Sequence, residues 1–491
     1  MFQGSGNHRV EQSGTGRYAG FLGAVAMLTA LGFASTGAAQ IFVDADAEGN
    51  NSGASWEDAF IELQSALTAA ITGDEIWVAC ASYLPTERSD QAEPRSASFF
   101  VRSGVSVYGG FSGGEETLEQ RQSDPLLNDC SLGDSSTLTE DFEGFFHLLT
   151  IDVVADPVVI DGFTIAGGRA TGGITQGAGA RINNADVTFR NIRFDDVATV
   201  TNGPGFGGAV FAQNSALTLD SVHMNECDSG RGGGVAAFGG SLTARHWTVT
   251  NCLGGFGGGP VLYMRNGASA EIADSHFENN RGNNEGGAIL NDGSGSDLTI
   301  RRTVFFGNTV RRSGAIAHFG DNLILENSVL AGNVGRFAGG ALRVGSSATA
   351  SVTNSTIAFN ENRSGVAIEA TGSATVAINN SIVFGNFITS LGPGAPDVPQ
   401  VGTTTETATL TASFSIIEGG FSGAGNLDIN PLFVQDPDPG DGTWETDEDN
   451  NFGNLRIQTA SPAIDAGDNL VLIDQTGTLP DTAADLPLDA G

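Results

Sequence analysis

An apolar-x-x-Asn step recurs along this chain at a nearly constant interval. The steps FENN, FFGN, LAGN, IAFN and VFGN end 28, 25, 27 and 26 residues apart, at Asn280, Asn308, Asn333, Asn360 and Asn386. Self-similarity at a period of roughly 20 to 50 residues is the signature of repeat architectures. It constrains the possible folds more than any other feature of the sequence.

Each step lies between two kinds of short β-type run. Runs such as LTIRRTVF and LILENSVL precede the step, and glycine-apolar runs such as GGAILN (286–291) and GGALRV (339–344) follow it. A helical period fits none of these runs, whereas alternation fits most of them. One repeat can form one turn of a coil with three short strands. Such a turn cannot bury its apolar side alone, so it must stack on the next turn.

Stacked turns lie about 4.8 Å apart, the spacing of hydrogen-bonded strands, so each repeat position faces its own copy. Asparagine can hydrogen-bond its copy as a ladder, and it tolerates a left-handed corner. The glycine pairs permit a positive φ at the next corner. We therefore predict an all-β fold, a right-handed parallel β-helix (solenoid) of about ten turns, its hand following strand twist and crossover preference.

An open stack of strands needs a cap, or its end pairs with other chains. Residues 55–79, SWEDAFIELQSALTAAITGDEIWVA, predict an N-terminal amphipathic capping helix that begins at Ser55, has Asp58 three residues on, and ends at Gly73. EIWVA then begins the first strand. The apolar residues at helical spacing are Phe60, Leu63, Leu67 and Ile71.

The N-terminus is typical of an export signal. A basic start, a short apolar core at 19–34 and small residues before Gln40 predict a signal peptide over residues 1–39, with an uncleaved anchor as the alternative. We expect the coil and its cap at 40–390, and the C-terminal end of the coil with an acidic loop at 391–491, truncated at Gly491. The expected location is secreted, or at the cell surface associated with an outer membrane.

The charge is strongly acidic: 57 acids against 22 bases, all of them arginine, for a net −35. Such a surface repels nucleic acid and anionic membranes, so neither is an expected partner. We expect no membrane insertion beyond the signal peptide.

Two of the four cysteines replace asparagine in the earlier copies MNEC and VTNC. Cys227 and Cys252 then lie in adjacent turns, within disulfide reach, and we predict a bridge between them. Two buried free thiols are the alternative. Cys80 and Cys130 cannot be paired from the sequence.

Arg311, Arg336 and Arg363 each lie three residues after a ladder asparagine. In register they form a column of like charge at steps of about 4.8 Å, which needs carboxylates, solvent or an anionic ligand. The functional interpretation is a groove that binds acidic polysaccharide. The alternative is a solvated edge of the coil.

The acidic run 436–451 allows two interpretations. Asp436, Asp438 and Asp441 could bind calcium together with backbone oxygens, although the run lacks EF-hand spacing. A solvated acidic loop is the alternative. No cofactor is expected to be required, and calcium is the one candidate.

A family resemblance rests on four segments and on the repeats. VDADAEGNNSGASWEDAFIELQSAL, GDEIWVACASYLP, VSVYGGFSGGE and SPAIDAGDN resemble secreted bacterial right-handed β-helix proteins with a pectin-lyase-like fold, and the GGAI and FxxN repeats resemble those of polymorphic outer-membrane proteins. The resemblance covers roughly residues 41–470. It implies the fold but says little about activity, because this fold supports lyases, hydrolases, adhesins and surface proteins.

Catalytic signals are weak. The resemblance implies lysine or arginine as a lyase base; lysine is absent, so a base would have to be arginine or another residue. Asp195-Asp196 is the only adjacent aspartate pair in the coil. We therefore expect an extracellular or cell-surface scaffold for adhesion or glycan contact, not an enzyme. A lyase or glycoside hydrolase acting on acidic polysaccharide is the alternative, and a structural envelope component is a third possibility.

Overall fold

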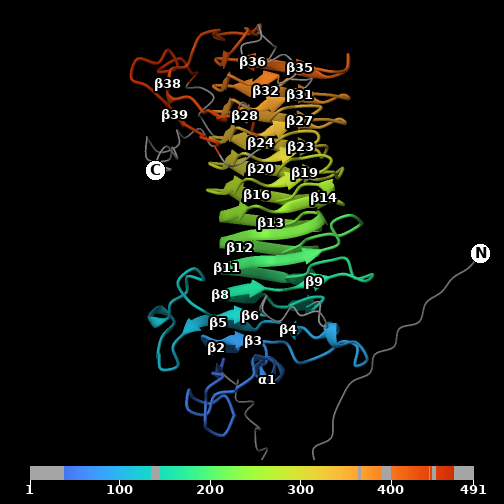
Figure 1. Ribbon diagram of the computed structural model, residues 1–491, viewed down its shortest axis with the longest axis vertical. Helices are drawn as coiled ribbons and strands as arrows, with labels where there is room; N and C mark the ends of the chain where they lie inside the picture. The colour runs from blue at the N-terminus through green and yellow to red at the C-terminus, as the bar shows by residue number, and fades with distance from the viewer. Residues whose placement is uncertain are drawn as a thin grey trace, which may run out of the picture. The chain divides into compact units, whose positions relative to one another are not determined.

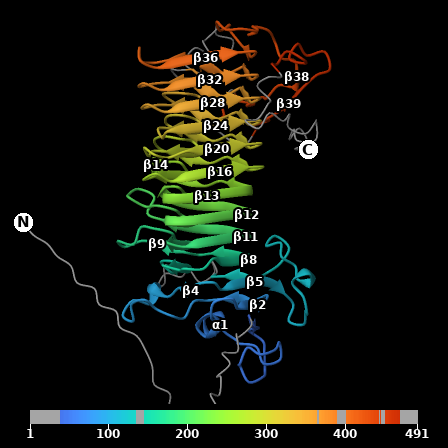
Figure 2. The same cartoon turned by 180° about the vertical axis from the view of Figure 1, so that it is seen from behind.

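The computed structural model describes residues 38–133, 144–362, 366–388, 400–441, 443–444 and 449–468. Thirty-seven strands of this part form one continuous parallel sheet that winds as a coil. In both Figure 1 and Figure 2 these strands stack turn upon turn, from β2 near the N-terminal end to β36 at the other. The predicted signal peptide falls outside the described residues.

The coil has four faces in its middle turns, where we expected three strands per turn. Four long strands bend across several faces: β8 (Val158–Ala166), β11 (Asp186–Thr199), β12 (Val210–Arg231) and β13 (Val235–Thr250). The other strands each belong to one face and pair in register with the strand one turn away.

Face 1 holds the glycine-apolar runs. Apart from the first residues of β12 and β13, it comprises β4 (Phe99–Phe100), β7 (Leu149–Asp152), β10 (Ala180–Asn183), β15 (Leu262–Arg265), β19 (Ile289–Asn291), β23 (Ile316–His318), β27 (Leu342–Val344), β31 (Ile368–Ala370) and β35 (Val401–Thr403). Face 2 follows in each turn. It comprises β1 (Gln40–Val43), β2 (Glu75–Ala79), β5 (Ser106–Phe111), β16 (Ser269–Ala273), β20 (Leu298–Arg301), β24 (Asn322–Glu326), β28 (Thr349–Thr353), β32 (Thr375–Asn379) and β36 (Thr409–Ser413).

Face 3 leads into the ladder, and face 4 follows it. Face 3 comprises β3 (Ser82–Tyr83), β6 (Ser131–Leu132), β17 (His276–Glu278), β21 (Val304–Phe306), β25 (Val329–Ala331), β29 (Thr356–Ala358), β33 (Ile382–Phe384) and β37 (Ile416–Ile417). Face 4 comprises β9 (Arg169–Ala170), β14 (Leu253–Gly258), β18 (Arg281–Gly282), β22 (Thr309–Val310), β26 (Val334–Gly335), β30 (Glu361–Asn362) and β34 (Phe387–Ile388).

The asparagine ladder runs inside the coil between faces 3 and 4. The Nδ2 of Asn280 donates to Oδ1 of Asn308 over 2.9 Å, and the same bond joins the later copies as far as Asn386. All five asparagines are buried. The left-handed corner residue is, however, not the asparagine itself. It is the residue before it, as at Asn279, Gly307 and Gly332.

The capping helix is shorter than predicted. Helix α1 spans Leu63–Ala69 and buries Leu63 and Leu67, but Ile71 is exposed. Ser55 is not its N-cap. Instead, the Oγ of Ser55 accepts a local bond from the Asp58 N–H, and Phe60 forms a parallel bridge with Val43. The helix packs against the first turns of the coil, so only its position and its central apolar residues follow the prediction.

The C-terminal segment does not continue the coil. β38 (Phe433–Gln435) pairs antiparallel with β39 (Asn454–Ile457), outside the large sheet. Both views show this pair beside the last turns (Figures 1 and 2). We call the described part of residues 430–468 the strap, because its aromatic rings cover the outer surface of face 3.

Candidate functional site

Arg311 and Arg336 occupy equivalent positions in adjacent turns. Each follows a face 4 strand by one residue, and Val310 pairs with Gly335 immediately before them. The N–H of Arg336 donates to the Val310 carbonyl, and the N–H of Phe337 donates to the Arg311 carbonyl. The expected column therefore exists for this pair. Arg363 lies outside the described residues.

The Arg311 guanidinium is exposed and stacks on an aromatic ring rather than on an acid. Its central carbon lies 5.4 Å from the centroid of the Phe337 ring, and Phe337 is itself 51% exposed. Among the residues that the structure describes, no carboxylate forms an ion pair with Arg311. A cation on a ring face keeps its charge directed at solvent.

The same combination occurs lower on this edge of the coil. The Arg231 guanidinium lies 5.0 Å from the ring centroid of Phe256, which is 55% exposed. Phe256 follows Cys252 by four residues, just as Phe337 follows Asn333. We call this surface, formed by Arg231, Phe256, Arg311, Arg336 and Phe337, the arginine edge.

Neighbouring arginines are neutralised. Glu285 pairs with Arg312 at 3.4 Å and with Arg343 at 3.0 Å, and Arg343 also reaches Glu369 at 3.5 Å. These two arginines therefore stabilise the turn-to-turn stack and contribute little net charge to the surface.

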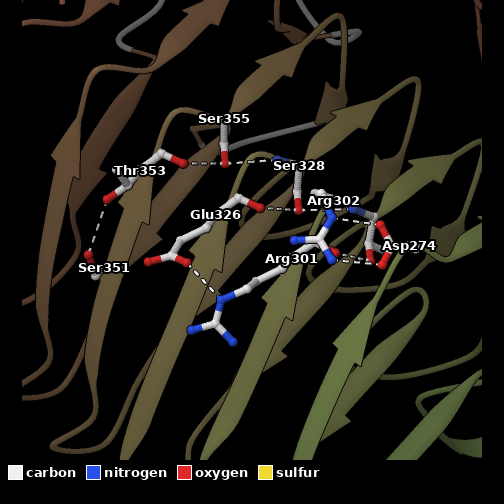
Figure 3. A network of polar contacts seen from close by, with 9 residues as sticks. Asp274, Arg301, Arg302, Glu326, Ser328, Ser351, Thr353 and Ser355 are labelled. Carbon is white, nitrogen blue, oxygen red and sulfur yellow. Dashed lines mark hydrogen bonds and ion pairs between the residues drawn. The ribbon is translucent and has the colours of Figure 1, made fainter. Parts of the chain in front are cut away.

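Two arginines at the end of a face 2 strand, Arg301 and Arg302, are likewise paired (Figure 3). Arg301 bonds Glu326 of the next turn at 2.9 Å, and Arg302 binds both oxygens of Asp274 at 2.6 and 2.7 Å. The hydrogen bond from Arg302 holds the pKa of Asp274 below its usual value. Of the predicted column, the described residues therefore contain the Arg311 and Arg336 positions in adjacent turns.

The Asp195-Asp196 pair does not form a catalytic couple. Asp195 bonds Arg193 at 2.9 Å on face 3, and Asp196, at the left-handed corner, bonds Arg169 at 2.6 Å. Each carboxylate has its own guanidinium, so the two serve separate ion pairs.

The predicted disulfide between Cys227 and Cys252 does not form. Both cysteines are free and buried, and the bridge joins Cys80 and Cys130, whose Cα atoms are 4.2 Å apart. In-register stacking gives the Cys252 sulfur the role that a ladder asparagine oxygen has, which explains why it is not bonded to the Cys227 sulfur. The Sγ of Cys252 accepts the N–H of Cys227, as an asparagine oxygen does higher in the ladder. Burial raises the pKa of the Cys227 thiol.

Asp436, Asp438 and Asp441 are not assembled into a metal cluster. No group of three potential ligands from His, Cys, Asp and Glu occurs in the described part of the chain. Asp438 and Asp441 instead accept the backbone N–H groups of Gly440 and Thr443. Calcium binding at this loop stays a prediction that these contacts do not support.

The sequence analysis missed a second ladder. Hydroxyl side chains line the interior corner between faces 2 and 3, where the Ser328 N–H donates to Ser355 Oγ at 3.2 Å and Thr303 N–H donates to Ser328 Oγ at 3.2 Å. Ser328 and Ser355 appear in Figure 3. The signal was present, because a serine or threonine stands five residues before every ladder asparagine from Asn280 to Asn386.

Comparison with known proteins agrees with this geometry. Residues 240–395 match the family described as right handed beta helix region. The chain is a right-handed parallel β-helix protein. A solved structure, the crystal structure of pectate lyase Pel9A, is similar at 13% identity with a TM-score of 0.33, over 92% of this chain and 96% of that chain. No curated protein matches the chain significantly.

The β-helix coil contributes no membrane-spanning helix. Within the described ranges, no helix is long and apolar enough to cross a bilayer.

Proposed function

We propose that this β-helix is a cell-surface or secreted scaffold that contacts acidic glycans through the arginine edge and does not cleave them. The observation that carries the proposal is the stacking of Arg311 on the exposed ring of Phe337, directly beside Arg336 in the adjacent turn. Repeated turns give such an edge the regular spacing that a linear polymer requires.

The chemistry of the edge fits a sugar acid. A guanidinium presents a planar fork of donors that matches a carboxylate or sulfate group, and it is charged at every relevant pH. The exposed phenyl rings offer an apolar surface beside that charge. A flexible polymer held by several weak contacts of this kind gains affinity from their number.

A binding role is favoured over a lyase role for the same arginines. Arginine cannot act as a base unless it loses its proton, and its side chain stays protonated in proteins. Arg311 stacks on a phenyl ring, and this cation–π contact favours the charged form of its guanidinium.

The test compares two double variants of the mature protein. Arg231→Gln/Arg311→Gln removes the two arginines of the edge that stack on exposed rings, and Arg193→Gln/Arg301→Gln removes two arginines that are paired with acids. We expect the edge variant to bind polygalacturonate, alginate or heparin about tenfold more weakly than the control, with added salt weakening the wild type most. Equal binding by both variants would place the site elsewhere. If the wild type binds none of the three polymers, acidic-glycan contact is refuted. If unsaturated uronate absorbance appears, the protein is a lyase instead.

A further inference from the structure

A groove that is separate from the arginine edge lies on face 1 near the N-terminal end of the coil. Its main cavity has a volume of about 590 Å³ and lies over β4, β7 and β10. Phe100, Thr150 and Arg181 are register partners in these three successive strands and all line the cavity. Loop residues Ser89, Asp90, Glu93 and Ser96, and loop residues 173–176, also line it.

The groove continues toward helix α1. A smaller hollow of about 160 Å³ shares Phe100, Thr150 and Asp152 with the main cavity, and it adds Gln64 of the helix and Glu87. Three stacked strands span roughly 10 Å along the coil axis. The site is therefore elongated, and its shape suits a short linear oligomer.

The floor of the groove is already organised by hydrogen bonds. Ser98 Oγ and Thr150 Oγ1 are 2.7 Å apart and buried, and the Asp152 carboxylate accepts Arg181 Nη1 at 2.8 Å. Gln64 Nε2 donates to Glu87 Oε2 at 2.7 Å. These side chains are held in place before any ligand arrives, which lowers the entropy cost of binding.

His147 adds an acceptor of fixed orientation. Its Nδ1 lies 2.8 Å from the Gly177 carbonyl, which can only accept, so Nδ1 carries the proton. Burial lowers the pKa of His147 to about 4, so the ring is neutral at neutral pH. Nε2 is then an acceptor at the groove, suited to a hydroxyl or ammonium donor.

The charge of the groove is opposite to that of the arginine edge. Asp90 and Glu93 line the main cavity in addition to the Asp152–Arg181 ion pair, so two carboxylates remain without a guanidinium partner among the described residues. The Phe100 ring supplies apolar surface, as does the part of the Phe146 ring that is not covered by the Arg95 guanidinium, whose central carbon lies 4.5 Å from the Phe146 ring centroid. An acidic polymer would be repelled here, and a cation would be attracted.

We infer that this groove is a separate binding site for a short oligosaccharide of free amino sugars. Hydroxyl groups of the sugars match the acceptors of the groove, ammonium groups match Asp90 and Glu93, and ring faces match the two phenylalanines. A basic peptide is a weaker fit. Peptide strands bind by adding to a free sheet edge, whereas β7 is already paired on both sides, with β4 and with β10.

The probe is the trimer of glucosamine, titrated into the mature protein by calorimetry. We expect it to bind about tenfold more tightly than the trimer of N-acetylglucosamine, which lacks the charge. Asp90→Asn/Glu93→Gln should remove that preference. The amide oxygens can still accept the backbone bonds from Ala92 and Arg95 that the acids accept now, so the loop is expected to keep its shape.

The matched control is Glu271→Gln, an exposed acid on face 2 outside the groove, which should change nothing. Arg231→Gln/Arg311→Gln should also leave trimer binding intact, so this inference and the proposed function can fail separately. No binding of the glucosamine trimer by the wild type, or equal binding of both trimers, would overturn the inference. Tighter binding of trilysine than of the glucosamine trimer, measured by competition, would also overturn the inference and would assign the groove to basic peptides.

Discussion

The side-chain amide of Asn280 lies directly beneath that of Asn308, donating Nδ2–H to its Oδ1 over 2.9 Å while the Asn280 backbone N–H donates to the same oxygen over 3.2 Å. Each ladder amide from Asn308 to Asn386 thus accepts two bonds from the turn below. The Nδ2 of Asn308 in turn donates to Oδ1 of Asn333 at 2.9 Å and to the Phe277 carbonyl at 3.0 Å. The ladder satisfies backbone groups that the corner would otherwise leave buried without partners.

Replacing one ladder asparagine should destabilise the coil. In Asn308→Ala, the buried backbone N–H of Asn280 loses its acceptor, and the Asn280 Nδ2, the Phe277 carbonyl and the Asn333 Oδ1 each lose one hydrogen bond. We expect a loss of about 3 kcal/mol in the free energy of unfolding, because a buried orphaned polar group costs roughly 1–3 kcal/mol. Guanidinium titration followed by circular dichroism measures it. Asn283→Ala, at an exposed position one loop away, should cost under about 0.5 kcal/mol. Equal midpoints for the two variants would contradict the role given to the ladder.

The repeat predicts the coil because stacking copies the geometry of one turn to the next. The interval from Asn280 to Asn308 therefore predicts a contact between residues that are far apart in the sequence. In a fold without repeats, no such interval indicates which residues meet. The same period encodes the hydroxyl ladder through Ser328 and Ser355, which could have been found by aligning the copies.

Features outside the repeat could not be predicted in this way. Helix α1 begins eight residues later than Ser55 because Phe60 pairs with Val43, a tertiary contact that overrides the local helical spacing. The Cys227 and Cys252 positions are adjacent, as the register requires, but the Sγ of Cys252 accepts a backbone N–H instead of bonding to the other sulfur. The ion pairs of Arg301 and Arg302 depend on which acids the neighbouring turns present, which the position of the arginines in the repeat does not fix.

The cysteine assignment predicts a specific thiol count. Two thiols, those of Cys227 and Cys252, should react with an alkylating reagent after unfolding without reductant. In the native protein both should react slowly, because they are buried and the pKa of Cys227 is raised, which keeps that thiol protonated. Peptide mapping by mass spectrometry should recover Cys80 linked to Cys130. A linked Cys227–Cys252 peptide would contradict the structure.

The Cys80–Cys130 bridge should stabilise the N-terminal turns. The two residues are 50 apart in sequence, for which the chain-entropy estimate is about 4 kcal/mol. Cys80→Ser/Cys130→Ser should lower the thermal midpoint and expose this end to protease first, whereas the conservative Cys252→Ser variant should leave the N-terminal cleavage pattern unchanged. Identical cleavage of all three proteins would show that the bridge does not hold this end.

The strap should detach when its aromatic anchor is lost. Phe452 stacks on Phe306 at 4.8 Å and on the buried Trp444 at 5.3 Å, and it lies over the bare backbone of Gly332. Phe452→Ala should therefore expose Trp444, seen as a red-shifted fluorescence, and speed proteolysis after residue 430 with little change in the unfolding of the coil. Phe256→Ala, which removes an exposed ring, serves as the control. A strap that resists protease equally in both variants would show that other contacts hold it.

The Asp274–Arg302 pair predicts a stability difference that depends on pH. Hydrogen bonding from Arg302 depresses the pKa of Asp274 in the folded state, so its contribution is present above the unfolded pKa near 3.8 and is lost as the pH falls through the folded value. Asp274→Asn keeps the left-handed corner, which asparagine tolerates, but removes the charge. Because both side chains are about one-third exposed, we expect a loss of only about 1 kcal/mol at neutral pH. The difference from wild type should shrink as the pH falls below the unfolded pKa near 3.8 and vanish once Asp274 is protonated in the folded state. Urea titrations across this range measure it, with Asp186→Asn on the same face as a control for general charge loss. A difference that stays constant with pH would mean that the variant acts through packing and not through the ion pair.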